Sequence, residues 1–175
     1  RKMTIRAGTY DDCQDAPLVV ITAGAAQKPG ETRLDLLSRN AQILESVTKR
    51  VMASGFDGIL LVASNPVDIM TQVVYEASGL PHQKVIGSGT SLDTARLRYE
   101  IAKQINIDVR NVHAYILGEH GDSEFVCWSN ANVGAKPLKD VIETMDEIEF
   151  SDLKKIAVRV RDAAAHIIKR KHATY

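Results

Sequence analysis

The chain has 175 residues, of which 45% are hydrophobic and 25% are charged, and its formal net charge is zero. This composition is typical of a globular protein with a sizeable core, and the neutral charge argues against general nucleic-acid binding. The longest apolar run, residues 58–63, is too short to cross a membrane. Two cysteines far apart in the sequence favour reduced thiols over a disulfide, which suits a cytoplasmic protein.

The first half of the chain alternates short apolar runs with helical periodicity, the pattern of a parallel sheet with crossover helices. Strands are predicted at residues 16–23, 58–63 and 84–87. A helix over residues 34–51 is expected to stop at Gly55. A second helix follows Asn65, which we expect to be its N-cap residue, with Pro66 at the first helical position.

The second half has a different pattern. A helix from Thr90 to about Asn106 is expected first. After it the sequence predicts a strand, a turn and a second strand, antiparallel to the first, at residues 111–117, 118–122 and 124–128. Ser151 is predicted to cap a last helix, whose apolar stripe continues to Ile168.

This change of pattern places a boundary near Gly89, between a nucleotide-binding half (residues 1–89) and a substrate half (residues 90–175). The chain begins with Arg1 rather than methionine, and its last helical pattern has no closing signal. We therefore expect the sequence to be an internal fragment of a longer protein.

His120 lies in the segment GEHGDSE, between two glycines that permit a tight turn and expose the imidazole ring. Such a histidine belongs either to an ordinary surface turn or to an active site, and the motif alone leaves both open. A metal site is not predicted, because no HExxH spacing occurs. In addition, His113 and His120 would point to opposite faces of an extended chain.

Asp93 and Arg96 lie near the start of a predicted helix, and two interpretations are open. In the structural one, Thr90 and Asp93 form a capping box while Asp93 and Arg96 form an ordinary i,i+3 pair. In the functional one, Asp93 orients a histidine, and the planar guanidinium of Arg96 binds a carboxylate through two hydrogen bonds.

Two more polar residues follow the carboxyl ends of predicted parallel strands, where open α/β sheets bind ligands. Arg33 ends the loop QKPGETR, which suits a lid over a ligand, although a solvated arginine at a helix start has the same pattern. Asn65 is explained either as a helix cap or as a ligand contact.

Four segments occur together in one order: AGAAQKPGETR, VASNPVDI, GSGTSLDTARLR and GEHGDSE. With them, the chain resembles the bacterial L-lactate dehydrogenases of the lactate and malate dehydrogenase superfamily, from Tyr10 to Tyr175. The resemblance implies an α/β fold: a Rossmann-type parallel sheet, incomplete at its N-terminus, and then part of an α+β substrate domain. It also implies the cofactor NAD and reversible hydride transfer between NADH and pyruvate giving (S)-lactate, the final step of fermentative glycolysis.

The resemblance assigns roles to these residues. His120 matches the acid/base residue, Asp93 matches the partner that orients it, and Arg33 matches the lid arginine that polarises the substrate carbonyl. The substrate-binding positions it implies are Gln27, Arg33, Asn65, Asp93, Arg96 and Thr174. The cofactor-binding positions it implies are Tyr10, Gly24, Ala25, Ser46, Ala63, Ser64, Asn65 and Ser88.

Gln27 carries the expectation about the substrate. In the family this position faces the substituent on C2, and an arginine there would favour a second carboxylate, as in malate dehydrogenases. A neutral glutamine leaves the extra charge of oxaloacetate without a counter-ion, which is costly in a buried site. Lactate is therefore favoured, and malate or another L-2-hydroxy acid is the alternative.

Arg98 and His113 match positions where bacterial members bind the activator fructose 1,6-bisphosphate, and the family is usually a homotetramer. Either residue also fits an ordinary solvated position. The chain lacks the GxGxxG loop and the ribose-binding acid with which the family begins, so NAD rather than NADP follows from the resemblance alone. A second hypothesis is that these 175 residues by themselves are a non-catalytic fragment.

Overall fold

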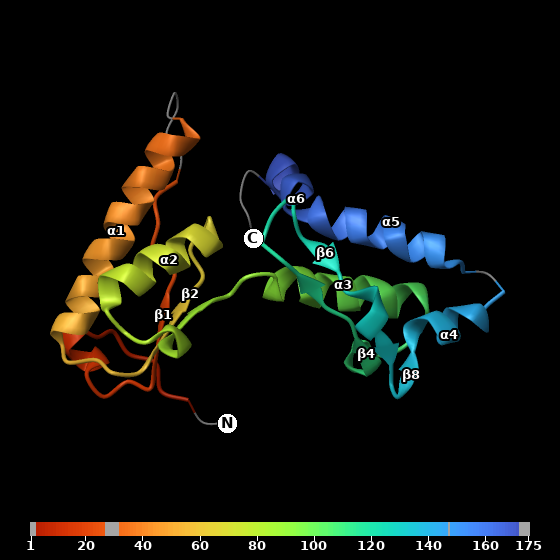
Figure 1. Ribbon diagram of the computed structural model, residues 1–175, viewed down its shortest axis with the longest axis horizontal. Coiled ribbons are helices and arrows are strands. Elements are labelled where there is room, and N and C mark those ends of the chain that lie inside the picture. Colours follow the sequence, from red (N-terminus) through yellow and green to blue (C-terminus); the bar gives the residue numbers. More distant parts are fainter. Residues whose placement is uncertain (1–2, 27–31, 147, 172–175) are drawn as a thin grey trace. The chain divides into compact units, whose positions relative to one another are not determined.

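The computed structural model describes residues 3–26, 32–146 and 148–171, and the chain forms two compact units, residues 1–88 and 89–175 (Figure 1). The first unit contains a parallel sheet with connecting helices, and the second combines helices with short antiparallel strands. The predicted fold class, a Rossmann-type parallel sheet followed by an α+β part, is confirmed.

The first unit is built on a three-stranded parallel sheet with the order β1 (Leu18–Ile21), β2 (Ile59–Val62) and β3 (Val85–Gly87). Helix α1 (Arg33–Ala53) connects β1 to β2, and helix α2 (Val67–Ser78) connects β2 to β3. The 3-10 helices η1 (Tyr10–Cys13) and η2 (His82–Lys84) precede β1 and β3. All three predicted strands are confirmed.

Helices α1 and α2 pack on one face of this sheet, and the other face is exposed among the described residues. On one face Leu60 and Val62 are fully buried, in one cluster with Leu44 of α1 and Met70 of α2. The other face carries large apolar side chains that are 38 to 49% exposed, namely Leu18, Val20, Ile59 and Ile86. Parallel sheets in α/β proteins are normally covered on both faces. The described residues therefore cover only one face of this sheet.

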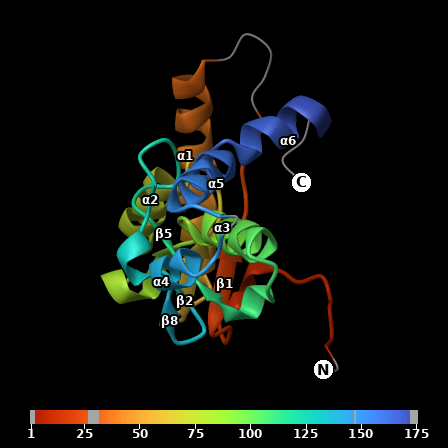
Figure 2. The same cartoon turned by 90° about the vertical axis from the view of Figure 1, so that its right-hand side faces the viewer.

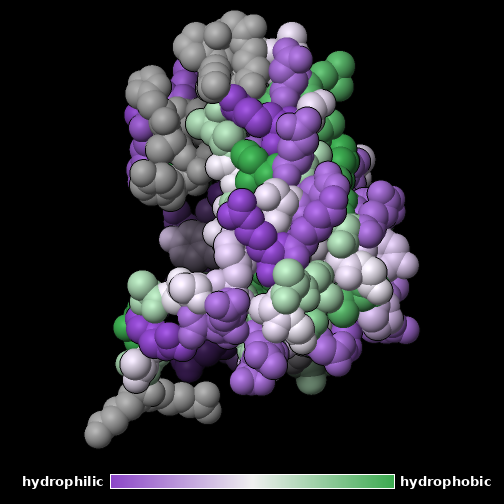
Figure 3. Space-filling model, turned by 90° about the vertical axis from the view of Figure 1, so that its left-hand side faces the viewer, coloured by the Kyte–Doolittle hydropathy of each residue, from purple (hydrophilic) through white to green (hydrophobic). Residues whose placement is uncertain are grey.

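Helix α1 begins with a capping box, in which the Thr32 hydroxyl accepts a hydrogen bond from the Asp35 backbone N–H at 3.1 Å. Leu44 and Val51 on its apolar stripe are buried, whereas Leu34 in the first turn is 74% exposed, and its outer side carries charged residues such as the i,i+4 pair Glu45 and Lys49. Hydrophilic side chains accordingly predominate over this helix in Figure 3.

Helix α2 begins one residue later than predicted. Pro66 has extended backbone angles (φ −71°, ψ 117°) and occupies the N-cap position, so the helix starts at Val67. The Asn65–Pro66 peptide bond is cis. The prediction that Asn65 caps this helix, with Pro66 as its first residue, is therefore wrong. Asn65 therefore has no role as the N-cap of α2.

The second unit is built on helices α3 (Ser91–Gln104) and α5 (Phe150–Arg161), which pack against each other (Figure 2). Leu97 of α3 and Ile156 of α5 are fully buried in its core. One antiparallel sheet has the strand order β4 (Val112–His113), β7 (Asn132–Val133) and β8 (Lys136–Pro137). The other short elements are η3 (Val109–Asn111), η4 (Trp128–Asn130), α4 (Leu138–Glu143) and α6 (Ala163–Lys171).

The strands β5 (Ile116–Leu117) and β6 (Phe125–Val126) form an antiparallel hairpin, which confirms the predicted pairing. The single strand predicted for residues 111–117 is wrong, because it is interrupted between β4 and β5. There the carbonyl of Ala114 accepts a hydrogen bond from Arg98 Nε at 2.9 Å instead of from a strand neighbour. β4 and β5 therefore belong to different sheets.

The last predicted helix is also different in the structure. It consists of two helices, α5 and α6, which are separated at Asp162. Helix α5 begins with a capping box of Glu149 and Asp152, so Ser151 lies inside the helix and does not cap it.

Thr90, the N-cap residue of α3, and Thr94 in its first turns hold the hairpin against this helix. Thr90 Oγ1 donates to the carbonyl of Ile116 at 2.6 Å, and Thr94 Oγ1 accepts from the Ile116 N–H at 3.0 Å. Thr90 therefore does not form the capping box predicted with Asp93, because its hydroxyl is bonded to the hairpin. Ile116 is only 2% exposed, so its backbone groups depend on these hydroxyls.

We predict that Thr94→Val destabilises the complete protein by about 1–3 kcal/mol, because it leaves the buried Ile116 N–H without its acceptor. Urea unfolding would measure this change. Thr144→Val is the matched control, since that exposed hydroxyl donates only to the Val141 carbonyl one turn earlier. Equal destabilisation by the two variants would contradict the assigned role of Thr94.

Candidate active site

The turn between β5 and β6 carries His120. Its first residue, Gly118, has a φ of +95°, and a Cβ atom there would lie 3.4 Å from the Ser123 carbonyl. The turn is closed by a hydrogen bond from the Glu124 N–H to the Gly121 carbonyl at 3.2 Å. The glycines that flank His120 therefore do permit the tight turn that the sequence indicates.

His120 and Asp93 meet although 26 residues separate them in the sequence. His120 Nδ1 lies 2.6 Å from Asp93 Oδ2. Since a carboxylate oxygen accepts, Nδ1 donates, which fixes the tautomer of the ring. Nε2 is then the ring nitrogen that can exchange a proton with a substrate. The Asp93 side chain is only 4% exposed, whereas His120 is 28% exposed.

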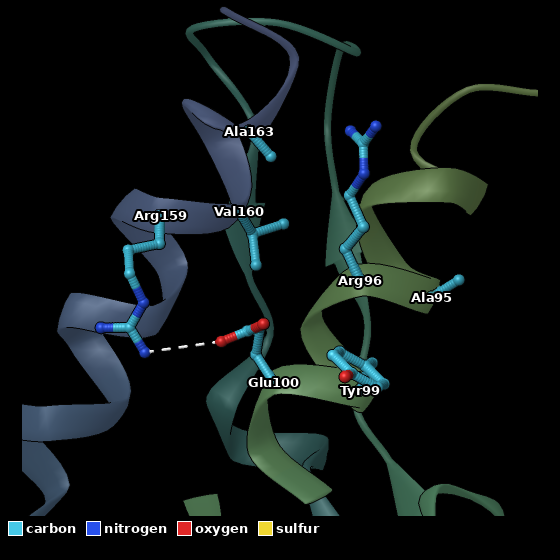
Figure 4. A pocket seen from close by; sticks show the side chains of 7 residues that line it. All are labelled: Ala95, Arg96, Tyr99, Glu100, Arg159, Val160 and Ala163. Carbon is cyan, nitrogen blue, oxygen red and sulfur yellow. Dashed lines mark ion pairs between the residues drawn. The ribbon is translucent and has the colours of Figure 1, made fainter. Parts of the chain in front are cut away.

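Arg96 lies on the same helix as Asp93. Its NH1 atom is 3.5 Å from Asp93 Oδ1, so the second carboxylate oxygen also faces a positive group. Figure 4 shows the Arg96 guanidinium pointing away from the ion pair between Glu100 and Arg159, whose atoms are 3.7 Å apart. Arg96 therefore lines the hollow between α3, α5 and α6 without being neutralised by Glu100.

Glu124 is a third member of this group, and the sequence reasoning missed it. One oxygen of its half-buried carboxyl lies within 4.8 Å of a carboxylate oxygen of Asp93 and of a ring nitrogen of His120. Burial raises the pKa of Glu124, and the negative charge of Asp93 raises it further. Such spacing would suit a shared cation, but here a hydrogen bond already joins His120 to Asp93.

In the first unit, most of the predicted cofactor positions follow the carboxyl ends of the parallel strands. They are Gly24 and Ala25 after β1, Ala63, Ser64 and Asn65 after β2, and Ser88 after β3. Ligands of open α/β sheets bind at such an edge. Tyr10 and Ser46 lie on η1 and in the middle of α1. Tyr10 lines a hollow with Val47 and Ala23, the residue before Gly24.

The backbone of this edge is held by internal hydrogen bonds. Ser64 Oγ donates to the Ala23 carbonyl at 2.5 Å, and the Ala25 N–H donates to Asn40 Oδ1 at 2.8 Å. Asn40, which is 5% exposed, was not predicted. Its signal in the sequence is a polar residue next to Ala41, which belongs to the apolar stripe of the α1 pattern.

In the second unit, the Arg98 side chain reaches the backbone next to His113. Arg98 donates to the carbonyl of Ala114, the residue after His113, and its guanidinium lies over the Tyr115 ring at 4.6 Å from the centroid. His113 is exposed on β4. Gln27 and Thr174 lie outside the described residues. Arg33 is the first residue of α1, and its side chain is outside the described part.

Comparison with known proteins gives a family for both units. Residues 1–87 match the family model of the lactate/malate dehydrogenase NAD-binding domain, and residues 90–175 match that of the lactate/malate dehydrogenase alpha/beta C-terminal domain. L-lactate dehydrogenase 2 of Enterococcus faecalis is 53% identical over 173 residues, which are 99% of this chain and 55% of the relative. The chain thus spans about half the length of the curated relatives it matches.

Solved structures agree with these matches. A lactate dehydrogenase, MGS-M5, from a Medee basin deep-sea metagenome library is 70% identical, with a TM-score of 0.95 over 100% of this chain and 56% of that chain. The minor L-lactate dehydrogenase of Enterococcus mundtii is 56% identical, with a TM-score of 0.90 over 96% of this chain and 54% of that chain. None of the described helices is long and apolar enough to cross a membrane.

Proposed function

We propose that this chain, which belongs to the lactate/malate dehydrogenase family, is part of an NAD-dependent L-lactate dehydrogenase that interconverts pyruvate and (S)-lactate. The observation that carries the proposal is the 2.6 Å hydrogen bond from His120 Nδ1 to the buried Asp93 carboxylate. This arrangement presents Nε2 as a proton donor and acceptor, which is what the reversible reduction of a 2-oxo acid requires.

The residues of the second unit would act as follows. His120 gives a proton to the carbonyl oxygen of pyruvate during reduction and takes it back during oxidation. Asp93 keeps the ring in one tautomer and holds Nε2 toward the substrate. Arg96 pairs with the substrate carboxylate through its planar guanidinium. We assign substrate binding to residues 90–175 on this basis.

We assign cofactor binding to residues 1–89. The strand ends that carry Gly24, Ala63 and Ser88 form an edge of small residues, which lets a flat ring system approach the backbone closely. When it is bound, the cofactor supplies the nicotinamide ring, which accepts the hydride in lactate oxidation and donates it in pyruvate reduction. Asn65 would contact both the substrate and the nicotinamide end of the cofactor, and Arg33 would polarise the substrate carbonyl from the lid loop. Further contacts are proposed for Tyr10, Ala25, Ser46 and Ser64.

Gln27 is the reason for preferring pyruvate to oxaloacetate, and Thr174 would border the same pocket. A glutamine supplies no positive charge for a second carboxylate. The second carboxylate of oxaloacetate would therefore lose hydration free energy that no ion pair in the pocket replaces. Malate or another L-2-hydroxy acid is the competing substrate. The similarity of this chain to lactate dehydrogenases supports lactate as the substrate.

We predict that the complete protein oxidises NADH with pyruvate and has a lower kcat/KM with oxaloacetate and with larger 2-oxo acids. Absorbance of NADH measures all three reactions. His120→Gln should remove most turnover while NADH still binds, because only the proton donor is lost. A preference for oxaloacetate would contradict the role of Gln27, and full activity of the His120 variant would exclude this histidine from the reaction.

The isolated 175 residues should behave differently from the complete protein. We predict little turnover and weak cofactor binding, because the described residues leave one apolar face of the sheet uncovered and the sequence contains no GxGxxG loop for the pyrophosphate. The same NADH assay and a fluorescence titration with NADH would test this. Turnover of the isolated chain equal to that of the complete protein would contradict the prediction.

We also propose that the complete protein is a cytoplasmic homotetramer of fermentative glycolysis that fructose 1,6-bisphosphate activates. Arg98 and His113 are the proposed phosphate ligands. Their proximity supports this, since the Arg98 side chain reaches the residue that follows His113. Two groups that can both be cationic suit a phosphate, and the activator would favour one quaternary state.

We predict that fructose 1,6-bisphosphate lowers the apparent KM for pyruvate of the complete protein, and that replacing Arg98 and His113 with glutamine abolishes this effect. Steady-state kinetics with and without the sugar bisphosphate measure it. Lys139→Gln with His82→Gln is a matched control, because it removes one cation and one histidine from exposed positions on α4 and η2. Undiminished activation of the Arg98/His113 variant would overturn the assignment.

A further inference from the structure

We propose that Glu124 is a positioning residue for the His120–Asp93 pair, and that its carboxyl group stays protonated and donates a hydrogen bond to the Asp93 carboxylate. The proposal rests on the proposed function, because it gives Glu124 a task in the same site. It adds a second carboxyl group to a pair that is otherwise one histidine and one aspartate.

The position of Glu124 is fixed by the hairpin. It directly precedes β6, and its backbone N–H closes the turn onto Gly121. One of its carboxyl oxygens lies within 4.8 Å of a carboxylate oxygen of Asp93 and of a ring nitrogen of His120, and the side chain is half-buried. The hairpin that carries His120 therefore also brings a second carboxyl group to Asp93.

The charges around this point favour a neutral Glu124. The Asp93 side chain is 4% exposed, so little water separates the two carboxyl groups. Burial, the charge of Asp93 and a hydrogen bond with Asp93 all raise the pKa of Glu124, while His120 on the turn and Arg161 on α5 lower it. Arg96 on α3 faces the other oxygen of Asp93. A hydrogen bond between two carboxyl groups requires a proton on one of them. Asp93 is in direct contact with His120 and Arg96, which favour its ionised form, so the proton is assigned to Glu124.

A neutral Glu124 would serve the pair in two ways. Its O–H would hold the Asp93 carboxylate in the orientation that His120 Nδ1 needs. It would also limit the pair to one negative charge. A second negative charge beside the ring would favour the protonated ring and would oppose transfer of its proton to the substrate oxygen.

The test uses the complete protein with Glu124→Gln, Glu124→Leu and the control Glu143→Gln, which neutralises an exposed glutamate on α4. The pH profile of kcat/KM for pyruvate is measured for each variant. Glutamine keeps a neutral donor, so kcat/KM should stay within about threefold and the midpoint of the profile should not move. Leucine removes the donor, so kcat should fall about tenfold or more with little change in KM.

The direction in which the midpoint of the pH profile moves distinguishes a neutral Glu124 from an ionised one. Losing a neutral donor leaves Asp93 more negative toward the ring, so the midpoint of the leucine variant should move to higher pH. If Glu124 were ionised, both variants would remove a negative charge, and both midpoints would move to lower pH. That result would overturn the proposal, as would profiles of both variants that match the Glu143→Gln control.

A spectroscopic measurement covers variants that fail to fold. The infrared spectrum of the parent protein at neutral pH should contain the C=O band of a protonated carboxylic acid, and Glu124→Gln should lack it. Absence of this band from the parent would overturn the proposal. Because the band does not depend on turnover, it is read even if the parent fails to reduce pyruvate, which would refute only the proposed function.

Discussion

The structure of the second unit depends on one buried carboxylate. Asp93 is 3% exposed, and a charge withdrawn from water to this extent must be compensated by close partners. His120 supplies one at 2.6 Å and Arg96 supplies the other at 3.5 Å. Because His120 belongs to a hairpin and Arg96 to α3, the carboxylate requires these elements to meet. The threonine hydroxyls on Ile116 and the positive φ of Gly118 make that meeting possible.

The sequence predicts what local periodicity controls. The parallel strands, the helices between them and the tight turn around His120 all follow from patterns within a few residues. The errors occur where a distant partner competes for a local group. The hydroxyl of Thr90 bonds to Ile116, 26 residues away, instead of capping α3. The carbonyl of Ala114 accepts a hydrogen bond from the Arg98 side chain, at the point where the predicted single strand is interrupted.

The same limit applies to the candidate site. No spacing in the sequence brings Asp93 and His120 together, so their pairing came from the family resemblance and the structure then supplied its geometry. Glu124 was missed because its relation to Asp93 exists only after the hairpin folds onto α3. Asn40 was missed because its partner, the Ala25 N–H, belongs to another element. A polar residue beside an apolar stripe was the one local signal for it.

Helix α3 is the element that these proposals share. Asp93, Arg96 and Arg98 occupy positions i, i+3 and i+5 of one helix, and Leu97 and Ile101 anchor it in the core with no exposure. Close-packed helices move as rigid bodies rather than bending residue by residue. A phosphate bound by Arg98 would therefore act on the same rigid helix that carries Asp93, the partner of His120, and Arg96, the proposed ligand of the substrate carboxylate. Because Arg98 is tied to Ala114, just before β5, such a force would also reach the hairpin that carries the histidine.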